Sequence, residues 1–209
     1  MSLPIYLMPG VGADERLFAG LPDARVLPRL SPEGSLADYA ARLAPHIDAS
    51  KPFDLGGSSF GGMIALELAR QVVPQHVFLF GSCRSPRAIA PSLRMLRFVL
   101  PAMHPPRWMR PFVARWFGAR TSAEIALFSD MLSATPIEFI RWASRAAFSW
   151  SGVPELPMPV HHIHGERDRI IPLRRVNPDR VVRGAGHLIN LTHADEVSEF
   201  ILTSAAASL

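Results

Sequence analysis

A serine bordered by glycines occupies the stretch GGSSFGG at residues 56–62. A strand-like run precedes it, and the helix-like segment 61–73 follows. If a strand reverses sharply into a helix, the residues two before and two after the apex come so close that only very small residues fit. Ser59 meets this demand, whereas Ser58 as apex would have Phe60 two positions later. We therefore predict Ser59 at the apex, facing a helix N-terminus that favours developing negative charge.

A serine hydroxyl is a weak nucleophile unless a base removes its proton. The candidate base is His187, which lies between glycine and leucine in GAGHL after the last predicted strand. Such a histidine needs a carboxylate that fixes its tautomer, and Asp168 in HGERDRIIP is the candidate. Glu166 is its rival, but the strand should end near Gly165, so that the following turn presents residue 168. The chain order is then serine, aspartate, histidine.

Other side chains that could do chemistry receive plainer interpretations. His161 and His162 fall inside a predicted strand and should be packed there, whereas His164 precedes a glycine and should support the acid loop. A metal site is not predicted, because alternate strand positions point to opposite faces. Cys83 is the only cysteine, which excludes an internal disulfide and a four-cysteine zinc site. We expect it to be a small packing residue.

These residues must be positioned by strands that alternate with helices. An apolar run of consecutive positions, as at 76–81, is typical of a strand covered on both faces. Alternation on short connections predicts a parallel sheet with helices on both sides, whose carboxyl edge is where such sheets bind ligands. The predicted strands are 4–8, 24–28, 53–57, 76–81, 159–165 and 179–184, and the predicted helices are 14–20, one that begins after an N-cap at Ser35, 61–73 and 192–203.

Residues 84–152 interrupt this alternation. They contain all four tryptophans and show helical spacing but no convincing strand. We predict a helical cap at 84–152, inserted after the fourth strand of a core domain formed by 1–83 and 153–209. The part 84–120 carries eight arginines and no acidic residue, so without it the net charge of +4 becomes −4. Such an excess is most often a solvated face, and no motif indicates nucleic-acid binding.

Four pieces together resemble the α/β-hydrolase fold superfamily. GGSSFGG is similar to its nucleophile elbow, HGERDRIIP to its acid loop, GAGHL to its histidine loop and PGVGAD at 9–14 to its oxyanion loop. The resemblance implies an α/β fold of about six mainly parallel strands under a helical cap. It implies a catalytic triad of Ser59, Asp168 and His187, and an oxyanion hole formed by the backbone N–H groups of Val11 and Phe60.

The chain departs from the family pattern in three places. The first two strands of the full fold are missing, Pro9 replaces the common histidine of the oxyanion loop, and Ser58 replaces the histidine often found before the nucleophile. The serine at the apex argues against haloalkane dehalogenase and epoxide hydrolase chemistry, because those relatives carry aspartate there.

The resemblance implies an esterase-like serine hydrolase that cleaves an ester of a small to medium apolar acid through an acyl-enzyme. Two alternatives stay open: a thioesterase acting on a phosphate-bearing carrier, which the arginines would meet, and a low-turnover relative that binds a small molecule. We expect a small-molecule acyl substrate, no cofactor, no metal and no nucleic-acid partner, and leave the oligomeric state open.

The expected location is cytoplasmic. The N-terminal MSLPIYLMPG lacks the features of a signal peptide. No apolar run reaches the roughly 18 to 20 residues of a membrane span, so stable membrane insertion is not expected.

Overall fold

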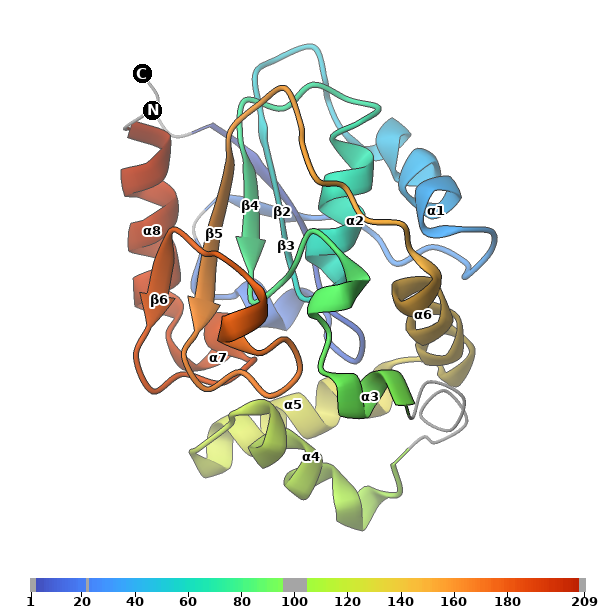
Figure 1. Ribbon diagram of the computed structural model, residues 1–209, viewed down its shortest axis with the longest axis vertical. Coiled ribbons are helices and arrows are strands. Elements are labelled where there is room, and N and C mark those ends of the chain that lie inside the picture. Colours follow the sequence, from blue (N-terminus) through green and yellow to red (C-terminus); the bar gives the residue numbers. More distant parts are fainter. Residues whose placement is uncertain (1–2, 22, 96–104, 207–209) are drawn as a thin grey trace.

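One parallel sheet forms the centre of the molecule (Figure 1). The computed structural model describes residues 3–21, 23–95 and 105–206. The six strands lie in the order β2-β1-β3-β4-β5-β6, and every neighbouring pair is parallel, which confirms the predicted sheet. They are β1 (Ile5–Met8), β2 (Ala24–Val26), β3 (Asp54–Ser58), β4 (Val77–Phe80), β5 (Val160–Gly165) and β6 (Arg180–Val182).

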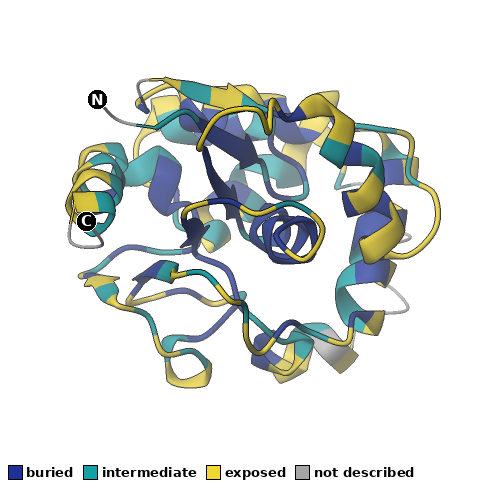
Figure 2. Ribbon diagram, turned by 90° about the horizontal axis from the view of Figure 1, so that it is seen from above, coloured by how far each residue is buried: buried dark blue, intermediate teal, exposed yellow. Residues whose placement is uncertain are grey.

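Helices cover both faces of the sheet, as predicted. On one face lie α1 (Leu36–Leu43) and α2 (Phe60–Leu68), whose buried side chains form a cluster with Val77 and Leu79 of β4. On the other face α8 (Ala194–Ala206) packs in a cluster with Phe78 and Phe80. Consecutive apolar residues of β4 therefore pack against helices on opposite faces of the sheet. Figure 2 shows the buried central strands and α2 in dark blue, surrounded by elements with exposed outer sides.

Several helix ends differ from the sequence prediction. The predicted helix 192–203 is α8, which begins two residues later, at Ala194. It is preceded by a short helix, α7 (Ile189–Thr192), and His193 between the two has the non-helical angles φ −143° and ψ 47°. The predicted helix 14–20 is a 3₁₀ helix, Glu15–Phe18. Ser35 caps α1 as expected, in a reciprocal capping box with Asp38. Further 3₁₀ helices are Ala44–His46, Pro86–Ala88, Arg107–Met109 and Leu173–Arg175.

Between β4 and β5, the described residues form four α-helices: α3 (Pro91–Met95), α4 (Arg110–Phe117), α5 (Ser122–Ala134) and α6 (Ile137–Ser149). In Figure 1, α3, α4 and α5 lie beyond the arrowheads of the strands, at the carboxyl edge of the sheet. The buried residues of α4, α5 and α6 join the two hydrophobic clusters that also contain the strands, and Leu93 of α3 is partly buried against one of them. Residues 96–104 of the predicted cap lie outside the described residues, and the domain limits at 84 and 152 remain a prediction.

Within the described ranges, no helix has both the length and the apolar character that crossing a membrane requires.

Candidate active site

Ser59 lies at the sharp turn between β3 and α2. Its backbone has φ 53° and ψ −118°. Residues other than glycine rarely adopt such angles, so the Ser59 backbone is strained. The Ser59 N–H still pairs with the Phe80 carbonyl at 3.0 Å, so the sheet holds this strained residue in place. Its side chain makes no capping hydrogen bond to α2. The hydroxyl therefore remains available at the carboxyl edge of the sheet.

The glycines around Ser59 are required by close backbone contacts. A Cβ on Gly57 would overlap the Gly61 carbonyl group, and a Cβ on Gly61 would overlap the Met8 carbonyl of β1. A Cβ on Gly10 would lie 3.2 Å from the Ser59 Cβ. The flanking positions two before and two after Ser59 are thus as crowded as the sequence predicted, because α2 begins directly against β3 and β1.

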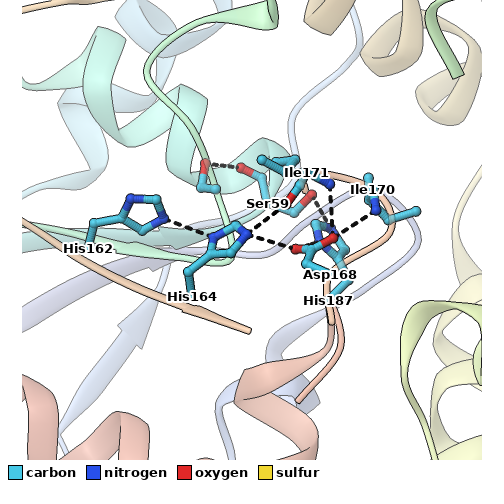
Figure 3. Close-up of polar contacts among 8 residues, drawn as sticks. Ser59, His162, His164, Asp168, Ile170, Ile171 and His187 are labelled. Carbon is cyan, nitrogen blue, oxygen red and sulfur yellow. Dashed lines mark hydrogen bonds and ion pairs between the residues drawn. The ribbon is translucent and has the colours of Figure 1, made fainter. Parts of the chain in front are cut away.

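The structure brings Ser59, His187 and Asp168 into one hydrogen-bonded line (Figure 3). His187 Nε2 lies 2.8 Å from Ser59 Oγ, and His187 Nδ1 lies 2.6 Å from Asp168 Oδ2. A carboxylate can only accept, so Nδ1 carries the proton and Nε2 accepts the hydrogen bond from the serine hydroxyl. This is the tautomer that a general base at Ser59 requires.

Asp168 is held as an anion despite its burial. Its Oδ1 accepts hydrogen bonds from the backbone N–H groups of Ile170 at 2.7 Å and Ile171 at 2.9 Å. Burial by itself raises the pKa of the Asp168 carboxyl, but His187, His164 and the Ile171 N–H outweigh burial and hold that pKa below its ordinary value. Its rival Glu166 is exposed and accepts instead from the Gly184 N–H at 2.7 Å.

Two further histidines of β5 extend this line away from Ser59 (Figure 3). His164 Nε2 lies 2.7 Å from the Ile171 carbonyl and 3.3 Å from Asp168 Oδ2, both of which only accept, so this nitrogen carries the proton. Burial lowers the pKa of His164 and lowers the pKa of His162 to about 3, so both rings are neutral. His162 Nε2, 3.0 Å from His164 Nδ1, must then donate to it. His164 supports the acid loop as predicted.

Replacing His164 with alanine is expected to lower kcat for an activated ester about tenfold while KM stays unchanged. The Ile171 carbonyl of the acid loop loses its hydrogen-bond donor, and the Asp168 carboxylate loses the N–H that faces it at 3.3 Å. A buried acceptor left without its partner costs about 1–3 kcal/mol. His164→Gln should recover most of kcat, because its amide offers both a donor and an acceptor. Steady-state kinetics check this, with His76→Gln, at the buried histidine beside Asp54, as the matched control. Equal losses in His164→Ala and His164→Gln would contradict a positioning role.

The loop after β1 presents backbone N–H groups beside Ser59. The Ala13 N–H bonds the Gly10 carbonyl at 3.2 Å, and Gly12 has φ 80°, the positive angle of the third position in a type II turn. Val11 is the second residue of this turn, whose N–H takes no part in the turn's own hydrogen bond. Phe60 begins α2, where helix geometry leaves the first N–H groups without partners. Their role as oxyanion donors remains a prediction.

A contact from α4 was not anticipated from the sequence. The Phe117 carbonyl accepts from the N–H groups of both His187 at 2.8 Å and Leu188 at 3.2 Å. The Phe117 and His187 rings lie 5.6 Å apart, and Gly118, at φ 113°, lets α4 end directly against Gly186. The inserted helices therefore hold the histidine loop. In the sequence, the only local sign of this contact is the glycine after α4, and a glycine there is also common at the end of any helix.

Three further polar or reactive side chains lie near the sheet: Ser82, His161 and Cys83. Ser82 was not anticipated from the sequence: it is fully buried and donates to the Ser59 carbonyl at 2.6 Å, behind the elbow. His161 packs against Phe78, with ring centroids 5.2 Å apart. Burial raises the pKa of the Cys83 thiol to about 12, so it is no nucleophile. Among the described residues, no group of three or more His, Cys, Asp or Glu side chains could hold a metal ion.

Comparisons with known proteins agree with this architecture. The sequence model of the alpha/beta hydrolase family matches residues 5–200. A thermophilic esterase from Thermogutta terrifontis superposes with a TM-score of 0.79 at 20% identity, covering 100% of this chain and 91% of the esterase. An enol-lactonase from Burkholderia xenovorans has a TM-score of 0.76 at 17% identity, covering 97% and 91% of the two chains.

An esterase from Exiguobacterium antarcticum has a TM-score of 0.79 at 14% identity, covering 97% of this chain and 91% of its own. A search of curated proteins by sequence finds no match. At these identities the solved structures establish a shared fold and leave the substrate open.

Proposed function

The chain belongs to the alpha/beta hydrolase family, and from that premise we propose that it is a serine hydrolase that cleaves carboxylic esters of small to medium apolar acids. The observation that carries the proposal is the line from Ser59 Oγ through His187 to Asp168, with spacings of 2.8 Å and 2.6 Å. Ser59, Asp168 and His187 are assigned as nucleophile, orienting acid and base. The strained backbone of Ser59 adds support, because such outliers gather at functional sites.

In the first half of the reaction Ser59 Oγ attacks the ester carbonyl carbon while His187 Nε2 takes the hydroxyl proton. The carbonyl oxygen becomes negative and is held by the N–H groups of Val11 and Phe60, which would each contribute on the order of 3 kcal/mol. The ionised Asp168 stabilises the imidazolium. His187 then gives its proton to the departing alcohol oxygen as the carbon–oxygen bond breaks, which leaves an acyl group on Ser59.

In the second half a water molecule takes the place of the alcohol. His187 removes a proton from it, the water oxygen attacks the acyl carbon, and the same N–H groups hold the second oxyanion. When this intermediate collapses, the proton on His187 returns to Ser59 Oγ and the carboxylic acid leaves.

The room beside the oxyanion loop supports an acid of limited size. A cavity of about 280 Å³ reaches this loop at Gly10, and its apolar lining includes Leu27, Leu43, Ile64 and Phe139. Ligand pockets usually measure about 300–1,000 Å³, so this cavity is at the small end. The lining also includes Tyr39 and the charged Asp14, Glu15 and Arg29, so we expect a hydrocarbon acyl chain to lie against the apolar part of the wall.

A series of p-nitrophenyl esters tests this proposal. We expect kcat/KM to be highest for acetate and butyrate and at least about tenfold lower for palmitate, because a long chain exceeds a cavity of that size. The thioesters acetyl- and butyryl-coenzyme A, assayed at matched concentrations, serve as the comparison and should be hydrolysed more slowly than the esters. A preference for palmitate would overturn the acyl size, a preference for the thioesters would overturn the ester assignment, and hydrolysis of neither class would overturn the proposed function.

A further inference from the structure

Three large aromatic side chains lie exposed in a row on the outer side of the inserted helices. Trp108, Phe112 and Trp116 are 71%, 65% and 38% exposed, and they follow one another at four-residue spacing along the 3₁₀ helix Arg107–Met109 and α4. Residues four apart share one helix face. Ala114, on the opposite side of α4, is fully buried. We call the three exposed residues the aromatic stripe; exposed apolar groups of this size gathered on one face mark an interaction site.

The aromatic stripe belongs to a segment of the sequence that is rich in arginine. The sequence from 84 to 120 holds no acidic residue and eight arginines: Arg84, Arg87, Arg94, Arg97, Arg107, Arg110, Arg115 and Arg120. Arg107 and Arg115 are exposed, and neither forms an ion pair with any described residue. Together with Arg110 they line a groove of about 530 Å³ between α4 and α5, where Asp130 is the one acidic lining residue described. Arg107, Arg110 and Arg115 thus lie beside the aromatic stripe, in a groove whose described lining has little compensating negative charge.

We propose that the aromatic stripe and its flanking arginines, Arg107 and Arg115, form a docking surface for an anionic lipid membrane. Tryptophan prefers the boundary between lipid headgroups and hydrocarbon, and arginine adds attraction to acidic headgroups. An acidic protein would match the charge equally well. The three rings, however, are exposed on a helix that lies at one extremity of the molecule (Figure 1), and none of them lines the groove beside Arg107. A fluid lipid surface accepts projecting rings without a matched cavity, whereas protein partners bind such anchors in shaped pockets.

The helix that carries the aromatic stripe, α4, lies near the candidate active site. It belongs to the helices beyond the carboxyl edge of the sheet (Figure 1), and its last residue, Phe117, bonds the loop of His187. A membrane bound at the aromatic stripe would therefore lie on the same side of the molecule as the line from Ser59 to Asp168. The surface does not cross the bilayer; it lies in the interface, as amphipathic helices with basic flanks do.

Vesicle binding tests the proposal without depending on hydrolysis. Vesicles of phosphatidylcholine alone and of phosphatidylcholine mixed with phosphatidylglycerol are sedimented with the whole protein. We expect binding to the mixed vesicles only, weakened by 1 M salt, which shortens the screening length to about 3 Å. Tryptophan emission should shift to the blue on binding; Trp142 and Trp150 are buried at 7% exposure each, so the shift reports Trp108 and Trp116.

Two matched pairs of variants assign the binding to the proposed surface. The variant Trp108→Ala/Phe112→Ala/Trp116→Ala should lower the partition coefficient at least about tenfold, whereas Val73→Ala/Leu202→Ala, at exposed apolar residues elsewhere, should not change it. Arg107→Gln/Arg115→Gln should lower it about fivefold per arginine, and Arg145→Gln/Arg174→Gln, also exposed, far less.

The proposal is overturned if mixed vesicles do not bind, or if the aromatic variant and its control bind equally. It is also overturned if the wild-type protein captures an acidic carrier protein through this surface but ignores vesicles. Circular dichroism of each variant confirms that it is folded, and unchanged hydrolysis of p-nitrophenyl acetate by the aromatic variant separates docking from the proposed function.

Discussion

Replacing Ser59 with alanine is expected to lower kcat for p-nitrophenyl acetate by at least about 10⁴-fold, because loss of a serine nucleophile removes the covalent route altogether. The remaining rate would come from the oxyanion donors and from binding alone. Alanine keeps a Cβ at φ 53° and removes only the hydroxyl, so the thermal unfolding midpoint should stay within a few degrees of wild type. Steady-state kinetics of the purified variant measure kcat, and thermal melts measure the unfolding midpoint.

Ser58→Ala is the matched control for Ser59. Ser58 is the neighbouring serine, buried at the end of β3, and it makes no contact with His187 among the described hydrogen bonds. Its variant should keep kcat within about threefold of wild type. Near-normal hydrolysis by Ser59→Ala, or a large loss in Ser58→Ala with Ser59→Ala unaffected, would show that the nucleophile has been misassigned.

Asp168→Asn should lower kcat by about 10⁴-fold at neutral pH, as the same change does in a serine protease triad. The backbone N–H groups of Ile170 and Ile171 donate to Oδ1 at 2.7 Å and 2.9 Å, so they would select the carbonyl oxygen of the new amide. Its NH₂ group must then face His187 Nδ1, 2.6 Å from the present Oδ2. This donor forces the proton of His187 onto Nε2, where it can no longer accept from Ser59.

Glu166→Gln is the control for Asp168→Asn. Glu166 lies on the same loop but is exposed, and its carboxylate accepts from the Gly184 N–H, which a glutamine carbonyl oxygen can also do. We expect kcat near that of wild type. Kinetics of the two variants, measured side by side, decide between the carboxylates. A large loss in Glu166→Gln with Asp168→Asn active would reverse the assignment of the acid.

The local parts of the fold and site could be predicted because they depend on neighbours in sequence. The sharp turn at Ser59 can be predicted from the glycines at 57 and 61, because the turn leaves no room for side chains at these two positions. The alternating strands and helices of the sheet follow from apolar patterning, and the turn after β5 presents Asp168 because the strand ends at Gly165.

Contacts between distant parts of the chain left little trace in the sequence. The Phe117 carbonyl reaches His187 across 70 residues, and nothing in the neighbourhood of either residue records the pairing. Ser82 behind the elbow and the donation from His162 to His164 depend on how β3, β4 and β5 lie beside one another. The arginine excess was visible in the sequence, but the projecting aromatic rings beside it required the position of α4.

The most direct test of the central claim, that Ser59 is the nucleophile, is mass spectrometry of the protein after reaction with a fluorophosphonate. We expect one adduct per chain, located on the peptide that contains Ser59, with no adduct in Ser59→Ala and a much slower reaction in Asp168→Asn. A protein that stays unlabelled at reagent concentrations that label serine esterases, or that carries the adduct on another residue, would contradict the claim.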